Sequence, residues 1–124
     1  MFSSELKIPR ERVAVLIGKK GVTKKTIERR TKTKITVNKD GEVLIEGEDS
    51  LETFNTGPVV KAIGRGFNPD IALMLLNEEY RLEIINIQDF TKKSKKKFVR
   101  IKARLIGTQG KARKVLEKLT MTDI

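Results

Sequence analysis

The 124-residue chain carries 27 Lys and Arg against 16 Asp and Glu, and its formal net charge of +11 favours a polyanionic partner such as nucleic acid. It contains no cysteine and no histidine, so disulfides, thiolate zinc sites and Ser/His or Cys/His catalysis are excluded. No apolar run is long enough to span a membrane and the N-terminus lacks a signal-peptide pattern, so we expect a cytoplasmic protein with no metal or cofactor.

The first elements alternate between strand and helix. Residues 6–8 form a short predicted strand, and residues 9–17 form a predicted helix with Pro9 at its first position. Gly18 ends this helix, and a second, strongly basic helix is predicted from residue 22 to about residue 30.

A β-hairpin is predicted at residues 34–47, because apolar and polar residues alternate on both sides of an Asp-Gly turn signal. A helix follows from about residue 48 to Gly64. We expect Gly57-Pro58 to break it, since an interior proline removes a backbone donor and clashes with the preceding turn. Asn68, Pro69 and Asp70 then form a capping sequence for a helix over residues 69–77.

The C-terminal part begins with a predicted strand at residues 80–87 and an exposed basic loop, Lys92 to Lys97. Residues 98–106 alternate as a half-buried strand would, but an internal repeat indicates a helix there. A shift of 89 positions aligns this part with the region around Gly18 and gives nine identities over the 20 positions from Leu16 to Ile35. The chain therefore contains one unit and part of another.

Both copies hold a Gly-x-x-Gly loop between two predicted helices, at residues 18–21 and 107–110. Glycines at this spacing let a ligand approach the backbone, and the N–H groups and dipole of the following helix favour an anion. The cations of the first copy are Lys19, Lys20, Lys24 and Lys25. Apolar residues, among them Ile35 and Val37, would form a floor for bases. The competing interpretation is a plain glycine turn joining two core helices.

The order of elements is that of a type I KH domain, and Gly18 to Ile35 resembles its core motif. The stretches VVKAIGRGFNPDIALMLLNEEYRLEIINI and RIKARLIGTQGKARKVLEKLT resemble the tandem-KH ribosome-assembly factors of the archaeal and eukaryotic Pno/Krr group. Gly64-Arg65-Gly66-Phe67 is the more specific mark of that group. Lys24 and Arg113 both stand where most KH domains carry an aliphatic residue.

This resemblance implies an α+β fold: a type I KH domain, with a three-stranded antiparallel sheet packed on three helices, followed by an incomplete second KH unit. The implied domains are residues 1–65, a linker helix at 66–79 and residues 80–124. The implied function is binding of single-stranded RNA, small-subunit ribosomal RNA near its 3′ end, without catalysis. Implied protein partners are the pre-rRNA endonuclease and other ribosome-assembly proteins. The RNA-binding residues carried over are Gly18, Lys19, Lys20 and Gly21, beside Lys24 and Lys25, and in the second copy Gly107, Thr108, Gln109, Gly110, Lys111 and Arg113.

The sequence ends at Ile124, which aligns with the opening of a strand, so the second unit lacks a hairpin and a last helix. A strand and two helices cannot cover their own apolar face. We therefore expect either a fragment or completion by another chain, including self-association through the incomplete unit.

Three other classes compete with RNA binding. An enzyme would need acid/base or metal groups, and neither a P-loop nor a dinucleotide-binding loop is present. A helix-turn-helix reader of duplex DNA also places a glycine turn between two helices, but the predicted hairpin and the loop lysines favour KH. A protein-docking module, with the charge serving solubility, is the third alternative.

Overall fold

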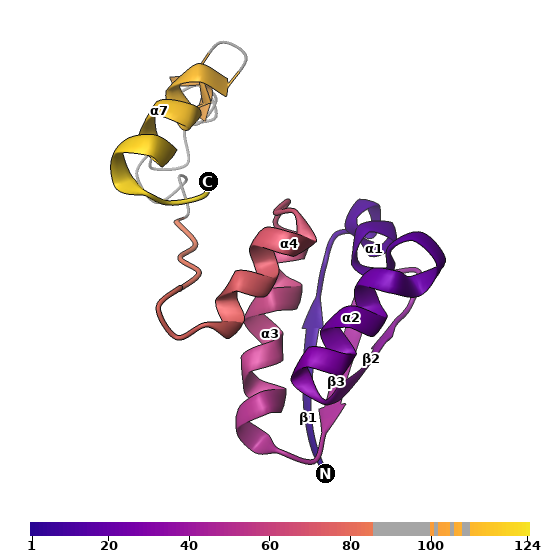
Figure 1. Cartoon of the computed structure of the whole chain (residues 1–124). Coiled ribbons are helices and arrows are strands. Elements are labelled where there is room, and N and C mark those ends of the chain that lie inside the picture. Colours follow the sequence, from indigo (N-terminus) through magenta and orange to yellow (C-terminus); the bar gives the residue numbers. More distant parts are fainter. Residues whose placement is uncertain (86–99, 101, 105, 108–109) are drawn as a thin grey trace. The chain divides into compact units, whose positions relative to one another are not determined.

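The structure, a computed structural model, describes residues 1–85, 100, 102–104, 106–107 and 110–124. The chain divides into two compact units, Met1–Leu82 and Glu83–Ile124. The elements of the first unit (Figure 1) are β1 (Phe2–Lys7), α1 (Arg10–Ile17), the 3-10 turn η1 (Lys19–Gly21), α2 (Val22–Thr31), β2 (Thr33–Val37), β3 (Glu42–Gly47), α3 (Ser50–Gly64), α4 (Pro69–Ala72) and the 3-10 helix η2 (Leu73–Leu76). The described residues of the second unit include α7 (Lys111–Thr120).

The three strands form one antiparallel sheet in the order β1-β3-β2. Its central strand, β3, places Val43 opposite Leu6 of β1 and Ile45 opposite Ile35 of β2. Alternate residues face the same side of a strand, so these residues share one face, and Ile35, Val43 and Ile45 are buried there. The predicted fold class, a type I KH domain with a three-stranded antiparallel sheet, is confirmed.

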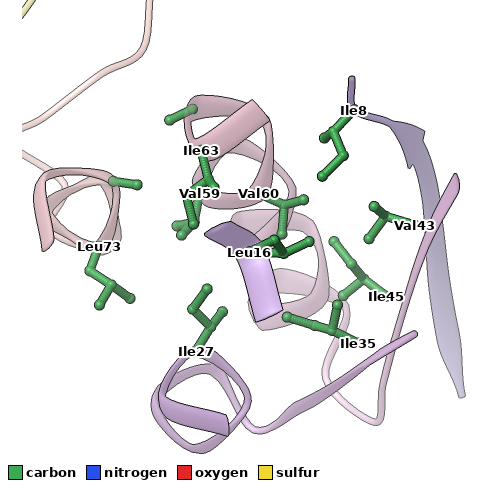
Figure 2. Packing of buried hydrophobic residues seen from close by; sticks show 12 residues of the cluster. Ile8, Leu16, Ile27, Ile35, Val43, Ile45, Val59, Val60, Ile63 and Leu73 are labelled. Atoms are coloured by element: carbon green, nitrogen blue, oxygen red, sulfur yellow. The ribbon is translucent and has the colours of Figure 1, made fainter. Parts of the chain in front are cut away.

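The core of the first unit lies between that face of the sheet and its helices (Figure 2). Leu16 of α1 and Ile27 of α2 are completely buried, as are Val59 and Ile63 of α3. Each side chain of this size contributes roughly 1.5–3 kcal/mol when it is fully buried. The core therefore ties α1 and α2, the two helices that flank the first glycine loop, to the sheet.

The predicted hairpin turn is present between β2 and β3. The side-chain oxygen Oδ1 of Asn38 accepts hydrogen bonds from the backbone N–H groups of Asp40 and Glu42, each at 3.0 Å. Gly41 has a φ of 90°, and its carbonyl oxygen accepts from the N–H of Ile8 at 2.8 Å. The turn thus also holds the segment between β1 and α1 in place, where Pro9 is the N-cap of α1 and not its first helical residue as predicted.

Helix α3 runs through Pro58 without the predicted interruption, so the expectation of an irregular back to this domain is wrong. Pro58 has no N–H to donate to the carbonyl of Phe54, so the helix loses one hydrogen bond there. Directly after the proline, Val59 and Val60 are completely buried. Their packing offsets the lost hydrogen bond and keeps the helix continuous to Gly64, where the sequence predicted its end.

The Gly64-Arg65-Gly66-Phe67 segment forms the turn after α3. A Cβ on Gly64 would lie 2.6 Å from Cγ2 of Ile8, and Gly66 has a φ of 112°. Arg12 of α1 reaches this turn: its Nε donates to the carbonyl of Ile63 at 2.7 Å and one terminal nitrogen donates to that of Phe67 at 3.0 Å. A cation at a helix C-terminus also complements the dipole, so Arg12 joins α1 to α3.

The helix predicted at residues 69–77 is present as α4 continued by η2, with the side chain of Asn68 accepting from the N–H of Asp70 at 2.9 Å. Ala72 and Leu73 contribute to the core of the first unit. The domain limits predicted at residues 65 and 79 stay a prediction.

The predicted strand at residues 80–87 is wrong over its described part, since residues 80–85 have no regular secondary structure. Leu82 instead packs against the core of the first unit, and no strand of the described part of the second unit is available to pair with this segment. Residues 86–87 and the basic run Lys92 to Lys97 lie outside the described residues. Of the helix predicted at 98–106, residues 100, 102–104 and 106 are helical and the others are outside the described residues. Within the described ranges, no helix is both long and apolar enough to cross a membrane.

Candidate nucleic-acid interface

The first glycine loop begins where α1 ends. The N–H of Gly18 donates to the carbonyl of Ala14 at 2.9 Å, and the chain then turns away from the helix with φ 76° and ψ 174°. A Cβ at this position would collide with the hydroxyl of Thr23 and would lie 2.8 Å from the backbone nitrogen of that residue. Both the positive φ and the contact with Thr23 therefore require glycine.

The two residues before α2 are left-handed. Lys20 has φ 56° and ψ 25°, and Gly21 has φ 75° and ψ 14°. The N–H of Gly21 donates to the carbonyl of Gly18 at 3.1 Å, and the N–H of Val22 donates to the carbonyl of Lys19. Gly21 is the N-cap of α2 and offers no side-chain acceptor to the next N–H groups. The first turn of α2 is therefore open to an anionic ligand.

The predicted cations of this loop lie around it. Lys19 and Lys20 are exposed on η1, Lys25 is exposed on α2, and Lys24 is half-buried. Among the described residues, no carboxylate forms a salt bridge with any of the four. A helix N-terminus favours negative charge and disfavours these four cations. A bound anion would therefore be attracted both by the helix dipole and by the lysines.

The second loop repeats this backbone. The N–H of Gly107 donates to the carbonyl of Ala103 at 2.8 Å, and that of Gly110 donates to the carbonyl of Gly107 at 3.3 Å. The φ values of these glycines are 72° and 76°. The structure thus brings Gly107 and Gly110 together at the N-terminus of α7, as predicted, whereas Thr108 and Gln109 lie outside the described residues.

The cations of the second loop are in two different situations. Lys111 is exposed at the first position of α7. The Nε atom of Arg113 lies 3.4 Å from Oε1 of Glu117, one helical turn further on. An exposed pair of this kind is weak, so Arg113 remains available to a phosphate at small cost.

The predicted apolar floor for bases is wrong at Ile35, which is only 1% exposed and points into the core beside Ile27 (Figure 2). Val37 is half-buried and packs against the same core. Strand alternation explains this, because β2 turns Ile35 and Val37 toward the helices together with the buried Thr33, and turns Lys34 and Thr36 toward solvent.

Sequence reasoning missed two groups of residues near the loop. Thr23 fills the space that a Cβ on Gly18 would need, and a contact between positions five apart across a turn has no sequence signal. Arg29 and Lys32 are exposed beyond Lys25 at helical spacing, and that spacing could have been read from the sequence.

The sheet order, the helix pair and the glycine loop define the class of a KH-domain protein. A family model described as KH domain matches residues 3–53. A second model, described as eukaryotic type KH-domain (KH-domain type I) and representing the second KH domain of Pno1-type proteins, matches residues 81–124.

Similar proteins come from archaea. A curated KH domain-containing protein of Methanocaldococcus jannaschii is 47% identical over 123 residues, covering 96% of this chain. The chain spans about half of that relative, 54% of its length.

The crystal structure of Dim2p from Pyrococcus horikoshii matches with a TM-score of 0.88 and 44% identity, over 99% of this chain and 74% of that one. A chain of the a/eIF2alpha–aDim2p–rRNA complex from the same organism matches with a TM-score of 0.87 and 45% identity, over 98% and 69%. A protein of unknown function from Aeropyrum pernix matches with a TM-score of 0.90 and 35% identity, over 99% and 68%. The chain belongs to the tandem KH-domain family of the Pno/Krr group, which includes archaeal Dim2p.

Proposed function

We propose that this protein binds single-stranded RNA through its Gly-x-x-Gly loops and that its RNA is small-subunit ribosomal RNA. The observation that carries the proposal is the first loop: Gly18 has no room for a Cβ, and the uncapped first turn of α2 follows it. A KH loop of this form clamps about four nucleotides by their backbone. The similar aDim2p of Pyrococcus horikoshii forms a complex with rRNA and a/eIF2alpha, which supports ribosomal RNA as the ligand here.

The residues proposed to contact RNA are those carried over from the sequence. In the first loop, the N–H groups at the start of α2 would meet a phosphate, with Lys19 and Lys20 beside it. In the second loop, Lys111 and Arg113 would supply the charge. The whole set is Gly18, Lys19, Lys20, Gly21, Lys24, Lys25, Gly107, Thr108, Gln109, Gly110, Lys111 and Arg113.

A role in small-subunit assembly or pre-rRNA processing is the finer part of the proposal. It would make the protein a cytoplasmic binding factor without catalysis that works beside the processing endonuclease or other assembly proteins. Self-association through the second unit belongs to the same set of proposed partners. These roles rest on membership of the family, and the loop geometry supports only their RNA-binding component.

A double charge reversal tests the first loop. We expect Lys19→Asp with Lys20→Asp to weaken binding of a single-stranded RNA, measured by fluorescence anisotropy, by more than about tenfold, because two cations become anions beside a phosphate. The matched control is Lys7→Asp with Lys61→Asp, which changes the net charge equally on β1 and α3, where both lysines are exposed. Circular dichroism confirms that each variant keeps its fold. Equal binding by the loop variant and the wild type would remove the loop as the site.

Two further titrations separate RNA binding from the competing classes. Preference for duplex DNA over single-stranded RNA would favour a helix-turn-helix reader. If about six phosphates of a single strand are bound, affinity falls roughly 300-fold between 50 and 200 mM salt. A response to salt that is flat would instead indicate a protein-docking module.

A further inference from the structure

The outer face of α2 carries a row of cations that extends beyond the glycine loop. We propose that Lys25, Arg29 and Lys32, the α2 strip, form a second phosphate-binding surface that guides RNA backbone beyond the clamped nucleotides. This inference rests on the proposed RNA-binding function and extends it from a short clamp to a longer track.

Helix geometry places Lys25 and Arg29 on one face of α2, because residues four apart are neighbours on a helix surface. Lys32 follows directly after Thr31, the last residue of the helix, and adds a third exposed cation at that end. The opposite face of α2 holds Ile27 and Thr31, both buried in the core. From Lys25 to the end of α2 at Thr31 the helix rises about 9 Å, more than the spacing of successive phosphates along one strand of a duplex. The strip is therefore long enough to meet more than one phosphate.

The charge of the strip is not neutralised locally. Lys25, Arg29 and Lys32 are all exposed, and in the part of the chain that the structure describes none of them forms a salt bridge. The single acid of α2, Glu28, uses its Oε2 to accept the N–H of Ile35 at 2.8 Å. Glu28 keeps its negative charge in this hydrogen bond, so the strip is net positive because its three cations outnumber that single acid.

The backbone supplies a second observation. Lys20 before α2 and Lys32 after it are both left-handed, with φ values of 56° and 54°. Glycine adopts this conformation without strain, whereas a lysine there carries a conformational cost. The helix dipole accounts for a cation at the C-terminal end, at Lys32, but it disfavours one at the N-terminal end, at Lys20. The left-handed turn at the helix end also occurs at Met121 of α7, so the charge of Lys20 at the N-terminal end is the feature that a bound polyanion would compensate.

The internal repeat supplies a third. On α7 the positions of Lys25 and Arg29 are held by Lys114 and Lys118, and both are exposed. The position of Val22 is held by Lys111, while that of Lys32 is held by Met121. The two helices thus keep cations on the corresponding face, although their other faces differ in burial.

The strip is tested with RNAs of two lengths. The variant is Arg29→Gln with Lys32→Gln, which leaves the loop lysines and Lys25 in place, and the matched control is Lys7→Gln with Lys61→Gln. The RNAs are single strands of about four nucleotides, the length a KH loop clamps, and about twelve. Binding of each is measured by NMR or anisotropy over a range of salt concentrations.

We expect the strip variant to bind the short RNA as the wild type does and the long RNA about tenfold more weakly, with a salt slope lower by about 1.4. The control should change neither. The proposal would be overturned if the strip variant bound the long RNA as tightly as the wild type does. It would also be overturned if the control variant lost as much affinity, or if the strip variant lost as much affinity for the short RNA. The loop variant, Lys19→Asp with Lys20→Asp, tests the proposed function separately. If the loop variant loses RNA binding and the strip variant does not, the proposed RNA-binding function stands and only the α2 strip is removed.

Discussion

The two glycine loops have nearly the same backbone. Gly18 and Gly107 have φ values of 76° and 72°, and Gly21 and Gly110 have 75° and 76°. Their helices also end alike, with Lys32 and Met121 both at a φ of 54°. The hydroxyls of Thr31 and Thr120, each at the last residue of its helix, donate to the carbonyl four residues earlier and are hydrogen-bonded to the threonine hydroxyl two residues later.

The loops differ in what covers the helix that follows. Ile27 on α2 is completely buried, whereas its counterpart on α7, Leu116, is 37% exposed. Ile35 is 1% exposed and its counterpart Ile124 is 56% exposed. In the first unit α2 is covered by α1, β2 and α3, and β2 is in turn paired with β3; α3 and β3 are more distant in sequence. The backbone conformation of each loop is therefore set by residues close to it in the sequence. The burial of the helix that follows the loop depends on segments that are distant in the sequence.

The largest effect should come from truncating the two equivalent apolar residues. Ile27→Ala should lower the free energy of unfolding by about 3 kcal/mol, because it leaves a cavity in a closed core. Leu116→Ala should cost less than about 1 kcal/mol, since its side chain is already partly in water. Urea denaturation followed by circular dichroism measures both. Equal losses would show that α7 is covered as α2 is.

The repeat explains how much of this could be predicted. The glycines and the Thr residues at positions 31 and 33 set local hydrogen bonds, so the loops, the helices beside them and the hairpin with its Asp-Gly turn were predicted close to their observed limits. These features depend on neighbours in the sequence, which is the range over which such patterns carry information.

The errors have the opposite origin. The break at Pro58 was predicted from a local rule that burial of Val59 and Val60 overrides. The strand at residues 80–87 was predicted from apolar alternation, but its described part, residues 80–85, is not a strand, because a strand forms only where another strand pairs with it. The base floor at Ile35 failed because the pattern does not say which face of β2 is covered. Each error arises because the outcome depends on contacts between residues distant in sequence, which a local sequence pattern does not report.

The glycines of the first loop separate backbone conformation from close contact. Gly18→Ala should cost about 2–3 kcal/mol, because it adds a Cβ against Thr23 as well as an unfavourable φ. Gly21→Ala should cost only about 1 kcal/mol, since its nearest neighbour would be Cε of Lys25 at 3.9 Å. Thermal unfolding of both variants gives the comparison. A loss at Gly21 as large as that at Gly18 would mean that the left-handed backbone alone makes this loop require glycine.

The smallest expected difference concerns the glutamate that the repeat preserves. Glu28 accepts the N–H of Ile35 and so holds the edge strand β2 against α2, whereas Glu117 pairs only with Arg113 in the described structure. Glu28→Ala should therefore lower the free energy of unfolding by about 1.5 kcal/mol, and Glu117→Ala by about 0.3 kcal/mol. Glu28→Gln keeps an oxygen that can accept the same N–H, so it should recover most of the loss. If Glu28→Gln is as unstable as Glu28→Ala, the stabilising effect of Glu28 comes from its negative charge among the cations of α2. The hydrogen bond that joins helix and strand would then not be its cause.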